Sequence, residues 1–295
     1  MSDHRRALTA AHVAAMLFGL TGIFGALIHA DASAVTCGRA AFACIALALF
    51  ARFQQRSLLR GLTRRQLGIL LLSGVVLALH WVTFFIAVKI GGVAIATLGF
   101  ASFPAFIALF DVLVFGERIG ARDTALLALV SGGLILVTPA FNLGDQGTLG
   151  LLWAVASGFS FALLATINRR AGGAMDAIQV AFWQNAVVAL VMLPFGWSSL
   201  WQMAWADWTY LALLGVFCTG LAQVLFVSSL RQLDARRAAL IIALEPVYAI
   251  ACAWWLFGQQ PMPHMLAGAL LIMAAIVLSG VAGTRKAGNG NRHPA

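Results

Sequence analysis

The sequence predicts an all-α polytopic membrane protein whose ten transmembrane helices form a 5+5 inverted-topology repeat. Three observations lead to this fold class: an excess of apolar residues, a one-sided distribution of basic residues and an internal repeat. Of 295 residues, 62% are hydrophobic and only 10% are charged, whereas a soluble domain carries roughly 25% charged residues. So few charges cannot cover a water-facing surface. The composition therefore excludes an ordinary cytosolic enzyme, a disordered chain and a nucleic-acid-binding protein, despite a net charge of +9.

Ten apolar stretches are long enough to be considered as membrane spans. One crossing needs about 20 mostly apolar residues, and lipid requires that backbone groups be paired within a helix. The first stretch exceeds the roughly 7–15 residues of a signal-peptide core, so we keep it as a helix. The predicted helices lie near Ala11–Ile28, Ser33–Phe50, Leu67–Val88, Val93–Phe115, Thr124–Thr138, Leu149–Ile167, Ile178–Phe195, Tyr210–Leu230, Ala238–Phe257 and Met265–Val281.

The basic residues set the expected orientation. With the N-terminus in the cytoplasm, 17 of the 19 Lys and Arg residues fall on inner segments, and only Arg39 and Lys89 fall on the outer half. This distribution follows the positive-inside rule, and a miscounted helix would scramble it. We expect a multi-pass protein of the inner (plasma) membrane with both termini cytoplasmic. Arg39 is expected to extend toward the outer surface or to pair with Asp31.

Tryptophans and cysteines are assigned structural roles. Trp197, Trp201, Trp205 and Trp208 crowd the connector after the seventh predicted helix, as expected of an aromatic belt at the membrane interface. The four cysteines lie in apolar stretches without a C-x-x-C pair. They are expected to fill core space rather than to form disulfides or bind a metal.

An internal repeat appears when the chain is compared with itself at an offset of 142 residues. Pro104 then meets Pro246, and Phe115-Gly116 meets Phe257-Gly258. The same offset aligns Trp81 with Gln223. We divide the chain into a first five-helix repeat (1–146), a second inverted five-helix repeat (147–283) and a disordered cytoplasmic tail (284–295).

Because five is odd, the second repeat enters the membrane from the opposite side. Inverted repeats are typical of secondary transporters, which bind substrate near the midplane between the halves. No G-x-x-x-x-G-K-[ST] loop is present to bind ATP phosphates. Transport is therefore expected to follow a substrate gradient or to couple to an ion. No cofactor and no metal site are expected.

The segments around Pro104 and Pro246 also carry a family resemblance. Leu113-Val114-Phe115-Gly116-Glu117 follows the first proline, and Leu256-Phe257-Gly258-Gln259 follows the second. With the 5+5 helices, the chain resembles the EamA-type family of the drug/metabolite transporter superfamily, and within it the YddG-type amino-acid exporters. The resemblance implies export of small metabolites. The chain departs from the family pattern at Gln259, which replaces an acid, and at Gln184, the counterpart of Arg39.

Ionisable groups at membrane depth are expensive and are functional candidates. His80 lies in the third predicted helix beside Trp81 and one turn before Phe84, and either a ligand contact or a bond to a backbone carbonyl would satisfy it. Glu245 precedes Pro246, whose ring disturbs the helix. It could contact a substrate amino group, couple to protons, as could His80, or serve only helix packing. Asp111 is expected at the inner end, as a gate salt bridge or a solvated helix end.

The remaining candidates are apolar or uncharged. Together with the ionisable groups they combine several aromatic rings with few polar atoms, as ligand pockets do. The predicted substrate-binding residues are Phe18, His80, Trp81, Phe84, Phe103, Phe159, Gln223 and Glu245, and the predicted hinge or gate residues are Pro104, Pro246 and Asp111.

These features predict an exporter of amino acids with aromatic or apolar side chains, working by alternating access. Its partners would be the small-molecule substrate, the lipid bilayer and, if transport is coupled, protons, with no nucleic acid. A multidrug or nucleotide-sugar carrier is the alternative among transporters. A nucleotide-sugar pocket would need inward basic residues, for which only Arg39 could serve. An intramembrane enzyme is the alternative of another class, but no nucleophile accompanies His80 and Glu245.

Overall fold

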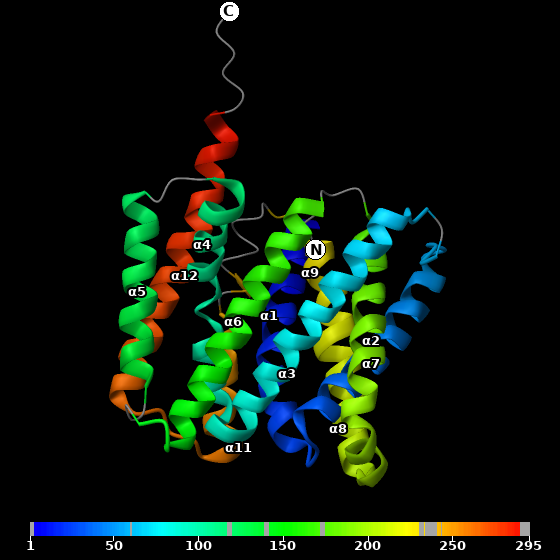
Figure 1. Ribbon diagram of the computed structural model, residues 1–295, viewed down its shortest axis with the longest axis horizontal. Coiled ribbons are helices and arrows are strands. Elements are labelled where there is room, and N and C mark those ends of the chain that lie inside the picture. Colours follow the sequence, from blue (N-terminus) through cyan, green and yellow to red (C-terminus); the bar gives the residue numbers. More distant parts are fainter. Residues whose placement is uncertain are drawn as a thin grey trace, which may run out of the picture.

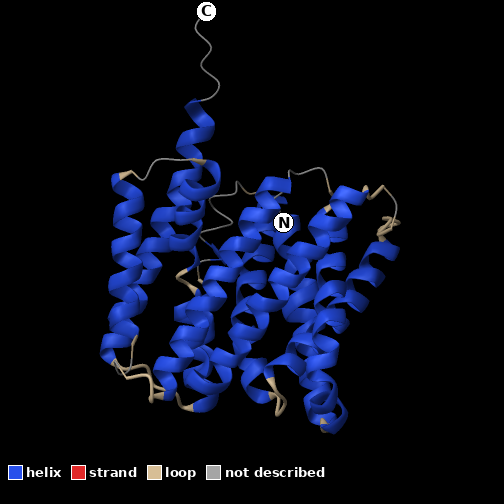
Figure 2. Cartoon of the chain, viewed as in Figure 1, coloured by secondary structure: helices blue, strands red, loops and turns tan. Residues whose placement is uncertain are grey.

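The computed structural model describes residues 3–59, 61–116, 120–138, 142–171, 175–229, 233, 241–242 and 244–289, and within these ranges the regular structure is entirely helical (Figures 1 and 2). The first half contains α1 (Asp3–Leu27), α2 (Ala32–Phe53), α3 (Arg64–Phe100), α4 (Phe103–Phe115) and α5 (Ala121–Val137). The second half contains α6 (Gln146–Ala171), α7 (Ala177–Gln202), α8 (Trp205–Gly215), the π-helix η1 (Val216–Leu221), α9 (Ala222–Ser229), α11 (Glu245–Phe257) and α12 (Pro263–Asn289).

Most predicted spans correspond to one helix each, with three differences. Helix α3 covers the third predicted span and the beginning of the fourth. The ninth predicted span is described only in part, because residues 234–240 and 243 lie outside the described residues and α11 begins at Glu245. Helix α12 continues to Asn289, so residues 284–289 of the segment expected to be disordered are helical, and residues 290–295 are outside the described part.

Helix α3 is a hairpin rather than one long rod. Gly92 interrupts it with φ 80° and ψ 169°, a backbone conformation that glycine adopts without steric strain. Residues twenty apart in a straight helix would be about 30 Å apart, yet the ring centroids of His80 and Phe100 are 5.1 Å apart. The chain therefore reverses at Gly92, and the arm after it runs back beside the arm before it, toward α4. This reversal is where the sequence separates the third and fourth predicted spans.

Helix α6 packs against both arms of this hairpin. At one end a Cβ atom on Gly150 would lie 2.5 Å from the Cα atom of Gly91. Further along, Gly158 lies so close to the α3–α4 connection that a Cβ atom would be 2.8 Å from the Ser102 hydroxyl oxygen. Small residues permit this close helix approach, so α6 is fixed in position and direction along its whole contact with α3.

Helices α4 and α11 repeat the same local structure at the offset of 142 residues. Each has 13 residues, begins with a residue followed by proline and ends at a glycine in the left-handed region: Gly116 has φ 67° and Gly258 has φ 66°. Proline is tolerated there because the first turn leaves its amide groups unpaired in any case. Pro104 and Pro246 thus begin new helices instead of bending continuous ones.

The helix pairings also match between the two halves. Helix α2 packs on α7 and α5 packs on α12, at opposite sides of the molecule, and α1 and α6 lie between them (Figure 1). Helix α6 packs on α3 and α4, and α1 packs correspondingly on α9 and α11. Corresponding helices of the two halves therefore make corresponding contacts.

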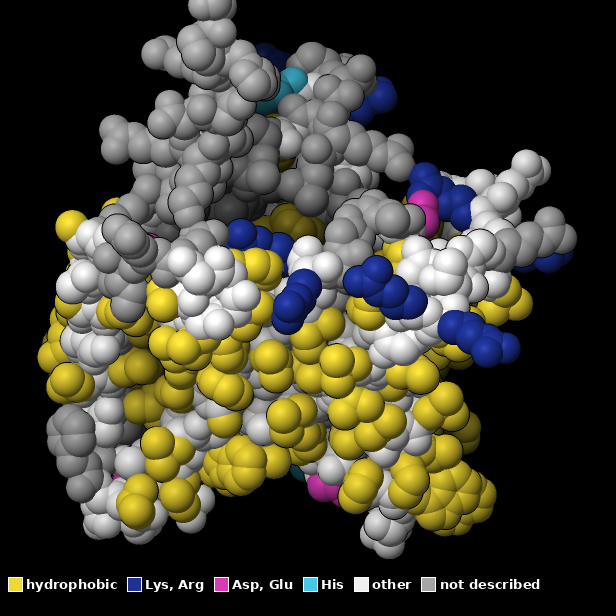
Figure 3. All heavy atoms as spheres, turned by 45° about the horizontal axis from the view of Figure 1, so that its top comes forward, with side chains coloured by type: hydrophobic (Ala, Val, Ile, Leu, Met, Phe, Trp, Pro, Cys, Tyr) yellow, Lys and Arg dark blue, Asp and Glu magenta, His cyan; other side chains and the backbone are white. Residues whose placement is uncertain are grey.

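The surface has an apolar belt bordered on one side by basic residues (Figure 3). Arginines of this border lie at the ends of α1, α2, α3 and α6, which we call the basic end: Arg5, Arg6, Arg52, Arg64, Arg65, Arg169 and Arg170. Among the described residues, six helices are long and apolar enough to cross a membrane, and α4, Asp123–Val137 and Pro263–Leu278 are shorter apolar helices. The belt identifies a multi-pass membrane protein.

The tryptophans and cysteines occupy structural positions. Trp197 and Trp201 stack with ring centroids 5.9 Å apart and are largely exposed, at the end of α7 away from the basic end. The four cysteines are free, and two of them, Cys37 and Cys218, are buried.

The backbone contact between Gly91 and Gly150 should limit what the hairpin tolerates. We expect Gly150→Ala to lower the apparent melting temperature of the purified protein in detergent, because overpacking costs about 1–3 kcal/mol. Gly68→Ala is the matched control, since a Cβ atom there meets nothing within 4 Å and alanine favours a helix. Equal melting temperatures for the two variants would contradict the close approach of α6 to α3.

Candidate functional site

Five rings gather where α3, α4 and α6 meet, and we call them the aromatic cluster: His80, Phe84, Phe100, Phe103 and Phe161. Phe100 lies at the centre, with ring centroids 5.1 Å from His80, 5.3 Å from Phe103 and 5.4 Å from Phe161. Phe84 joins it edge-on at 6.0 Å. Such pairs add stability beyond simple burial. The hairpin of α3 creates this cluster, because it returns Phe100 to the level of His80.

His80 is held by Ser157 of α6. Its Nδ1 atom lies 3.1 Å from the Ser157 carbonyl oxygen and 2.8 Å from the Ser157 hydroxyl oxygen, and this hydroxyl donates to the His80 carbonyl oxygen at 3.0 Å. A carbonyl oxygen only accepts, so Nδ1 carries the hydrogen and Nε2 is an acceptor in the neutral ring. The predicted alternative of a backbone bond is therefore present, and Nε2 remains available to a ligand.

Arg39 of α2 lies inside the helix bundle, 4% exposed. Its guanidinium carbon lies 3.9 Å from the centroid of the Trp81 ring and 5.4 Å from that of Phe85, in cation–π contact. Its Nε and Nη2 atoms donate to the Thr219 hydroxyl oxygen at 3.1 and 2.9 Å. The expectation that Arg39 extends outward or pairs with Asp31 is wrong: Asp31 caps the first turn of α2 through the Ala34 amide.

The π-helix η1 brings Thr219 to Arg39. The Thr219 hydroxyl donates to the carbonyl oxygen five residues earlier, Leu214, at 3.0 Å, and such wide turns are frequent at functional sites. Gly215 allows the approach of α2, because a Cβ atom there would lie 2.6 Å from the Arg39 carbonyl oxygen. One irregular turn and one small residue thus connect the two halves of the chain at a buried cation.

Glu245 lies in the first turn of α11 and is half-buried. Helix α1 contacts it closely, since a Cβ atom on Gly19 would lie 2.9 Å from the Glu245 carbonyl oxygen. One helical turn along α1, Gly22 faces the Phe84 ring, at 3.8 Å from a Cβ atom. Helix α1 therefore contacts both the beginning of α11 at Glu245 and the Phe84 ring of the aromatic cluster. Phe18 precedes Gly19 and is half-buried.

Two predicted site residues lie apart from the others. Phe159 is 42% exposed and packs on Phe106 and Phe110 of α4, with centroids 5.4 and 5.3 Å away. Gln223 lines a groove between α2, α7 and α9 together with Phe50. Phe159 is two residues from Ser157 and from Phe161, so it faces another side of α6. Gln223 follows η1, and the additional residue of the π-helical turn changes the direction that the following side chains face.

An ion pair lies toward the basic end. The Arg169 Nη1 atom is 2.6 Å from an Asp111 carboxylate oxygen, and the Arg169 guanidinium carbon is 4.2 Å from the centroid of the Phe115 ring. The sequence suggested a gate salt bridge or a solvated helix end for Asp111. Nearby Glu117 and Arg118 lie outside the described residues, as does the side chain of Arg122. The described partner comes instead from the end of α6, so this pair joins α4 to α6.

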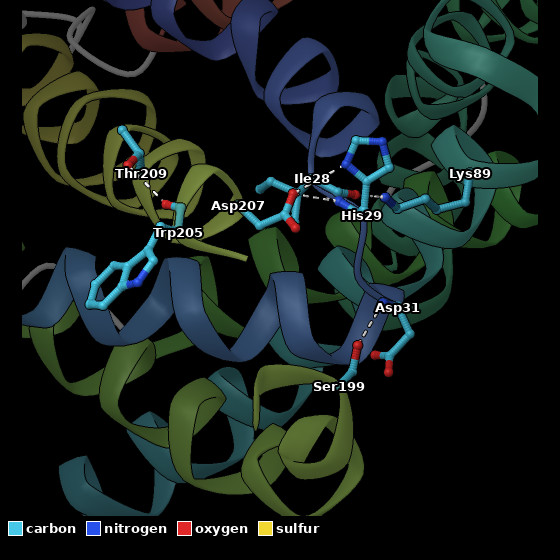
Figure 4. Close-up of polar contacts among 8 residues, drawn as sticks. All are labelled: Ile28, His29, Asp31, Lys89, Ser199, Trp205, Asp207 and Thr209. Carbon is cyan, nitrogen blue, oxygen red and sulfur yellow. Dashed lines mark hydrogen bonds and ion pairs between the residues drawn. The ribbon is translucent and has the colours of Figure 1, made fainter. Parts of the chain in front are cut away.

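At the opposite end, polar contacts hold the turn between α1 and α2 against three other helices (Figure 4). The His29 backbone N–H donates to Asp207 of α8 at 2.8 Å, and the Lys89 ammonium group of α3 donates to the Ile28 carbonyl oxygen. The Asp31 N–H donates to the Ser199 hydroxyl oxygen of α7 at 3.2 Å. We call these residues the turn cluster: Ile28, His29, Asp31, Lys89, Ser199 and Asp207.

The turn cluster also carries buried charge. Asp207 is 5% exposed, and its carboxylate oxygen lies 3.3 Å from the ring Nδ1 atom of the exposed His29. The charges of Lys89 and Asp207 also interact. These contacts tie the first half of the chain to the second at the end away from the basic border.

Sequence reasoning missed four residues that complete the site: Phe100, Ser157, Phe161 and Thr219. The sequence does contain a signal for two of them. Phe161 lies two residues after Phe159 and so faces a different side of the helix, and Ser157 is a hydroxyl residue directly before Gly158. No sequence signal marks the π-helix that directs Thr219. Among the described residues, no group of three or more His, Cys, Asp or Glu side chains is placed to hold a metal ion.

Comparison with known proteins identifies relatives over nearly the whole chain. The model of the EamA-like transporter family matches residues 5–138 and, a second time, 148–281. A pseudopaline exporter of Pseudomonas aeruginosa is 28% identical over 73% of this chain and 76% of its own. A protein of Salmonella typhimurium named "Probable amino-acid metabolite efflux pump" is 27% identical over 66% of this chain and 70% of its own. One solved structure, at 19% identity, has a TM-score of 0.65 over 97% of this chain and 99% of its own, and shares the fold.

The bonds between His80 and Ser157 should stabilise the contact of α3 with α6. We expect Ser157→Ala to lower the free energy of unfolding in detergent by about 1 kcal/mol, the usual size for an interhelical hydrogen bond in a membrane protein. Ser228→Ala is the control, because its exposed hydroxyl donates only within α9, to Leu225. A loss no greater than in the control would contradict this network.

Proposed function

The chain belongs to the EamA-like transporter family, which makes it a membrane transporter, and from this premise we propose that it exports amino acids with aromatic or apolar side chains by alternating access. The observation that carries the substrate class is the aromatic cluster with His80 at its edge. It offers a large apolar surface beside one hydrogen-bond acceptor, and α1 connects it to the first turn of α11, which carries the Glu245 carboxylate. Binding sites for small amphipathic molecules combine apolar walls with few polar groups in this way.

Alternating access needs two related halves of opposite orientation, and we propose ten spans in a 5+5 inverted repeat. The two family matches, at residues 5–138 and 148–281, support the proposed repeats at 1–146 and 147–283. The repeated helices α4 and α11 and the matching pairings of α1 and α6 support it further. The reversal at Gly92 supplies the extra crossing within α3, and α8, η1 and α9 together form one span.

Interrupted helices are suited to a substrate site. Their free N-terminal amide groups provide polar contacts at membrane depth without a lipid-exposed break. Helices α4 and α11 begin at Phe103 and Glu245, which are equivalent in the repeat. We propose that these two residues face the substrate differently, Phe103 toward its apolar part and Glu245 toward its amino group.

The turn cluster and the Asp111–Arg169 ion pair, at opposite ends of the bundle, would close the two ends alternately. The turn cluster joins the halves at the end away from the basic border, and the Asp111–Arg169 pair joins α4 to α6 at the other. By the positive-inside rule, the basic end is cytoplasmic, which places both termini inside and the turn cluster at the outer face of the inner membrane.

The amino-acid proposal is tested by flux. Purified protein is reconstituted in liposomes and loaded with radiolabelled Phe, Trp, Leu or Met, and efflux and uptake are measured with and without a pH gradient. We expect protein-dependent flux of at least one of these amino acids, and a response to the gradient would indicate proton coupling. Folded protein that carries none of them would refute the proposed substrate class.

Removing the polar groups of the proposed site should impair transport without preventing folding or membrane insertion. We expect His80→Ala and Glu245→Gln each to lower the flux by roughly tenfold or more, the effect of about 1.4 kcal/mol or more of binding free energy. Phe159→Ala, which removes a ring outside the aromatic cluster, is the control and should retain flux. Wild-type flux in both site variants would show that the site is elsewhere.

Loosening the turn cluster should open the outer end. In a variant without the four native cysteines, Val88→Cys, 3% exposed in this structure, reports access from outside through labelling by a membrane-impermeant maleimide. We expect Asp207→Asn to accelerate labelling several-fold, since the His29 amide then loses its charged acceptor. Thr209→Ala, which removes a hydroxyl bonded only within α8, should not. Unchanged labelling with Asp207→Asn would exclude the turn cluster as a closure.

A further inference from the structure

Arg39 has hydrogen-bond donors to spare. A guanidinium group carries five N–H bonds, and Thr219 accepts two of them at 3.1 and 2.9 Å. In the part of the chain that the structure describes, no other acceptor bonds to it. Trp81 and Phe85 are in cation–π contact with it but accept no conventional hydrogen bond. A buried cation with unpaired donors is costly, so the guanidinium is poised to bind an anion at its free edge.

Glu245 is the corresponding unpaired anion. Its carboxylate forms no hydrogen bond and no ion pair with any described residue, although the residue is half-buried at the beginning of α11. Its charge and that of Arg39 interact, but no direct ion pair joins them. A cation and an anion thus lie in one region of the bundle. They do not pair with each other, and both have hydrogen-bonding capacity left over.

The apolar surface lies next to both charges. Phe85, under the Arg39 guanidinium, is in edge contact with Phe84 at 5.7 Å, and Phe84 belongs to the aromatic cluster. On the other side, Gly22 faces Phe84 and Gly19 faces Glu245 along α1. Residues of α2, α3 and α11 thus place a cation and an anion beside the same aromatic surface. A molecule whose carboxylate and ammonium groups share one carbon needs such an arrangement.

We propose that Arg39 and Glu245 form a two-ended receptor for a zwitterion, in which Arg39 binds the substrate carboxylate, Glu245 binds its ammonium group and the aromatic cluster packs its side chain. This inference rests on the proposed function and assigns the selection of the carboxylate to Arg39. The planar guanidinium fork matches a carboxylate with two parallel hydrogen bonds. A substrate without net charge satisfies both buried groups and leaves the charge of the site unchanged.

A structural role makes a different prediction for Arg39. If it only held α2 to η1, its loss would weaken every ligand alike. Selection of a carboxylate instead changes the preference among ligands that differ at one group. We therefore compare L-phenylalanine with L-phenylalaninamide, which lacks the carboxylate, and with 3-phenylpropionate, which lacks the ammonium group. The readout is the ligand-induced rise in melting temperature of purified protein, which does not depend on transport.

We expect the wild-type protein to bind L-phenylalanine at least roughly tenfold more tightly than either analogue, the effect of one charge-assisted hydrogen bond. Arg39→Gln should abolish the preference over L-phenylalaninamide but keep the preference over 3-phenylpropionate. Glu245→Gln should do the reverse. Arg39→Lys, which keeps the charge without the fork, should retain an intermediate preference and serves if Arg39→Gln does not fold.

Gln184→Met is the matched control, because it removes the buried bonds from the repeat counterpart of Arg39 to Ser73 and Asn168 while leaving both charges. It should lower the melting temperature and preserve both preferences. The inference is overturned if Phe, Trp, Leu and Met all fail to stabilise the wild-type protein, or if Arg39→Gln weakens all three ligands equally. Selective binding without flux in liposomes would support the receptor and refute the transport proposal, so the two failures are distinguishable.

Discussion

The close packing of α6 against the hairpin of α3 is the interaction on which the rest of the structure depends. Gly91 and Gly150 bring the two backbones into contact, and Gly158 does the same at the α3–α4 connection. In lipid there is little hydrophobic driving force between helices, so packing and interhelical hydrogen bonds must hold them together. The glycines supply the packing, and the bonds between His80 and Ser157 supply the polar contact. The aromatic cluster exists because this contact returns Phe100 to His80.

Several helices of the bundle are interrupted close to the candidate site. Gly92, the starts of α4 and α11 and the π-helix η1 are all interruptions of regular helix. The last three adjoin side chains that the proposed transport uses: Phe103, Glu245 and, through Thr219, Arg39. An interrupted helix leaves amide and carbonyl groups unpaired, and in a membrane these groups must be covered by protein or by a substrate. Structural irregularity and the candidate site therefore coincide.

Corresponding positions of the two halves carry different chemistry. Arg39 of α2 bonds to Thr219 of η1, whereas Gln184 of α7 bonds to Ser73 of α3 and Asn168 of α6. Phe103 and Glu245 likewise begin equivalent helices. The repeated backbone thus carries a cation on α2 and an anion on α11. The equivalent helices α7 and α4 carry the neutral residues Gln184 and Phe103. Such asymmetry gives a substrate one preferred orientation, which a symmetric cavity would not.

The sequence by itself determined the class of protein, the positions of most helices, the basic border and the equivalence of α4 and α11, because hydropathy, charge and proline spacing act locally along the chain. It also identified His80, Trp81, Phe84, Phe103 and Glu245 as candidates, since polar or aromatic residues at membrane depth require partners. Only the tertiary structure decided which partners they have. Arg39 lies inside the bundle because Gly215 and the turn of η1 admit it, and Phe159 separates from Phe161 because two residues on a helix face different neighbours. Such contacts join residues far apart in sequence, and their geometry depends on helix packing that no local pattern encodes.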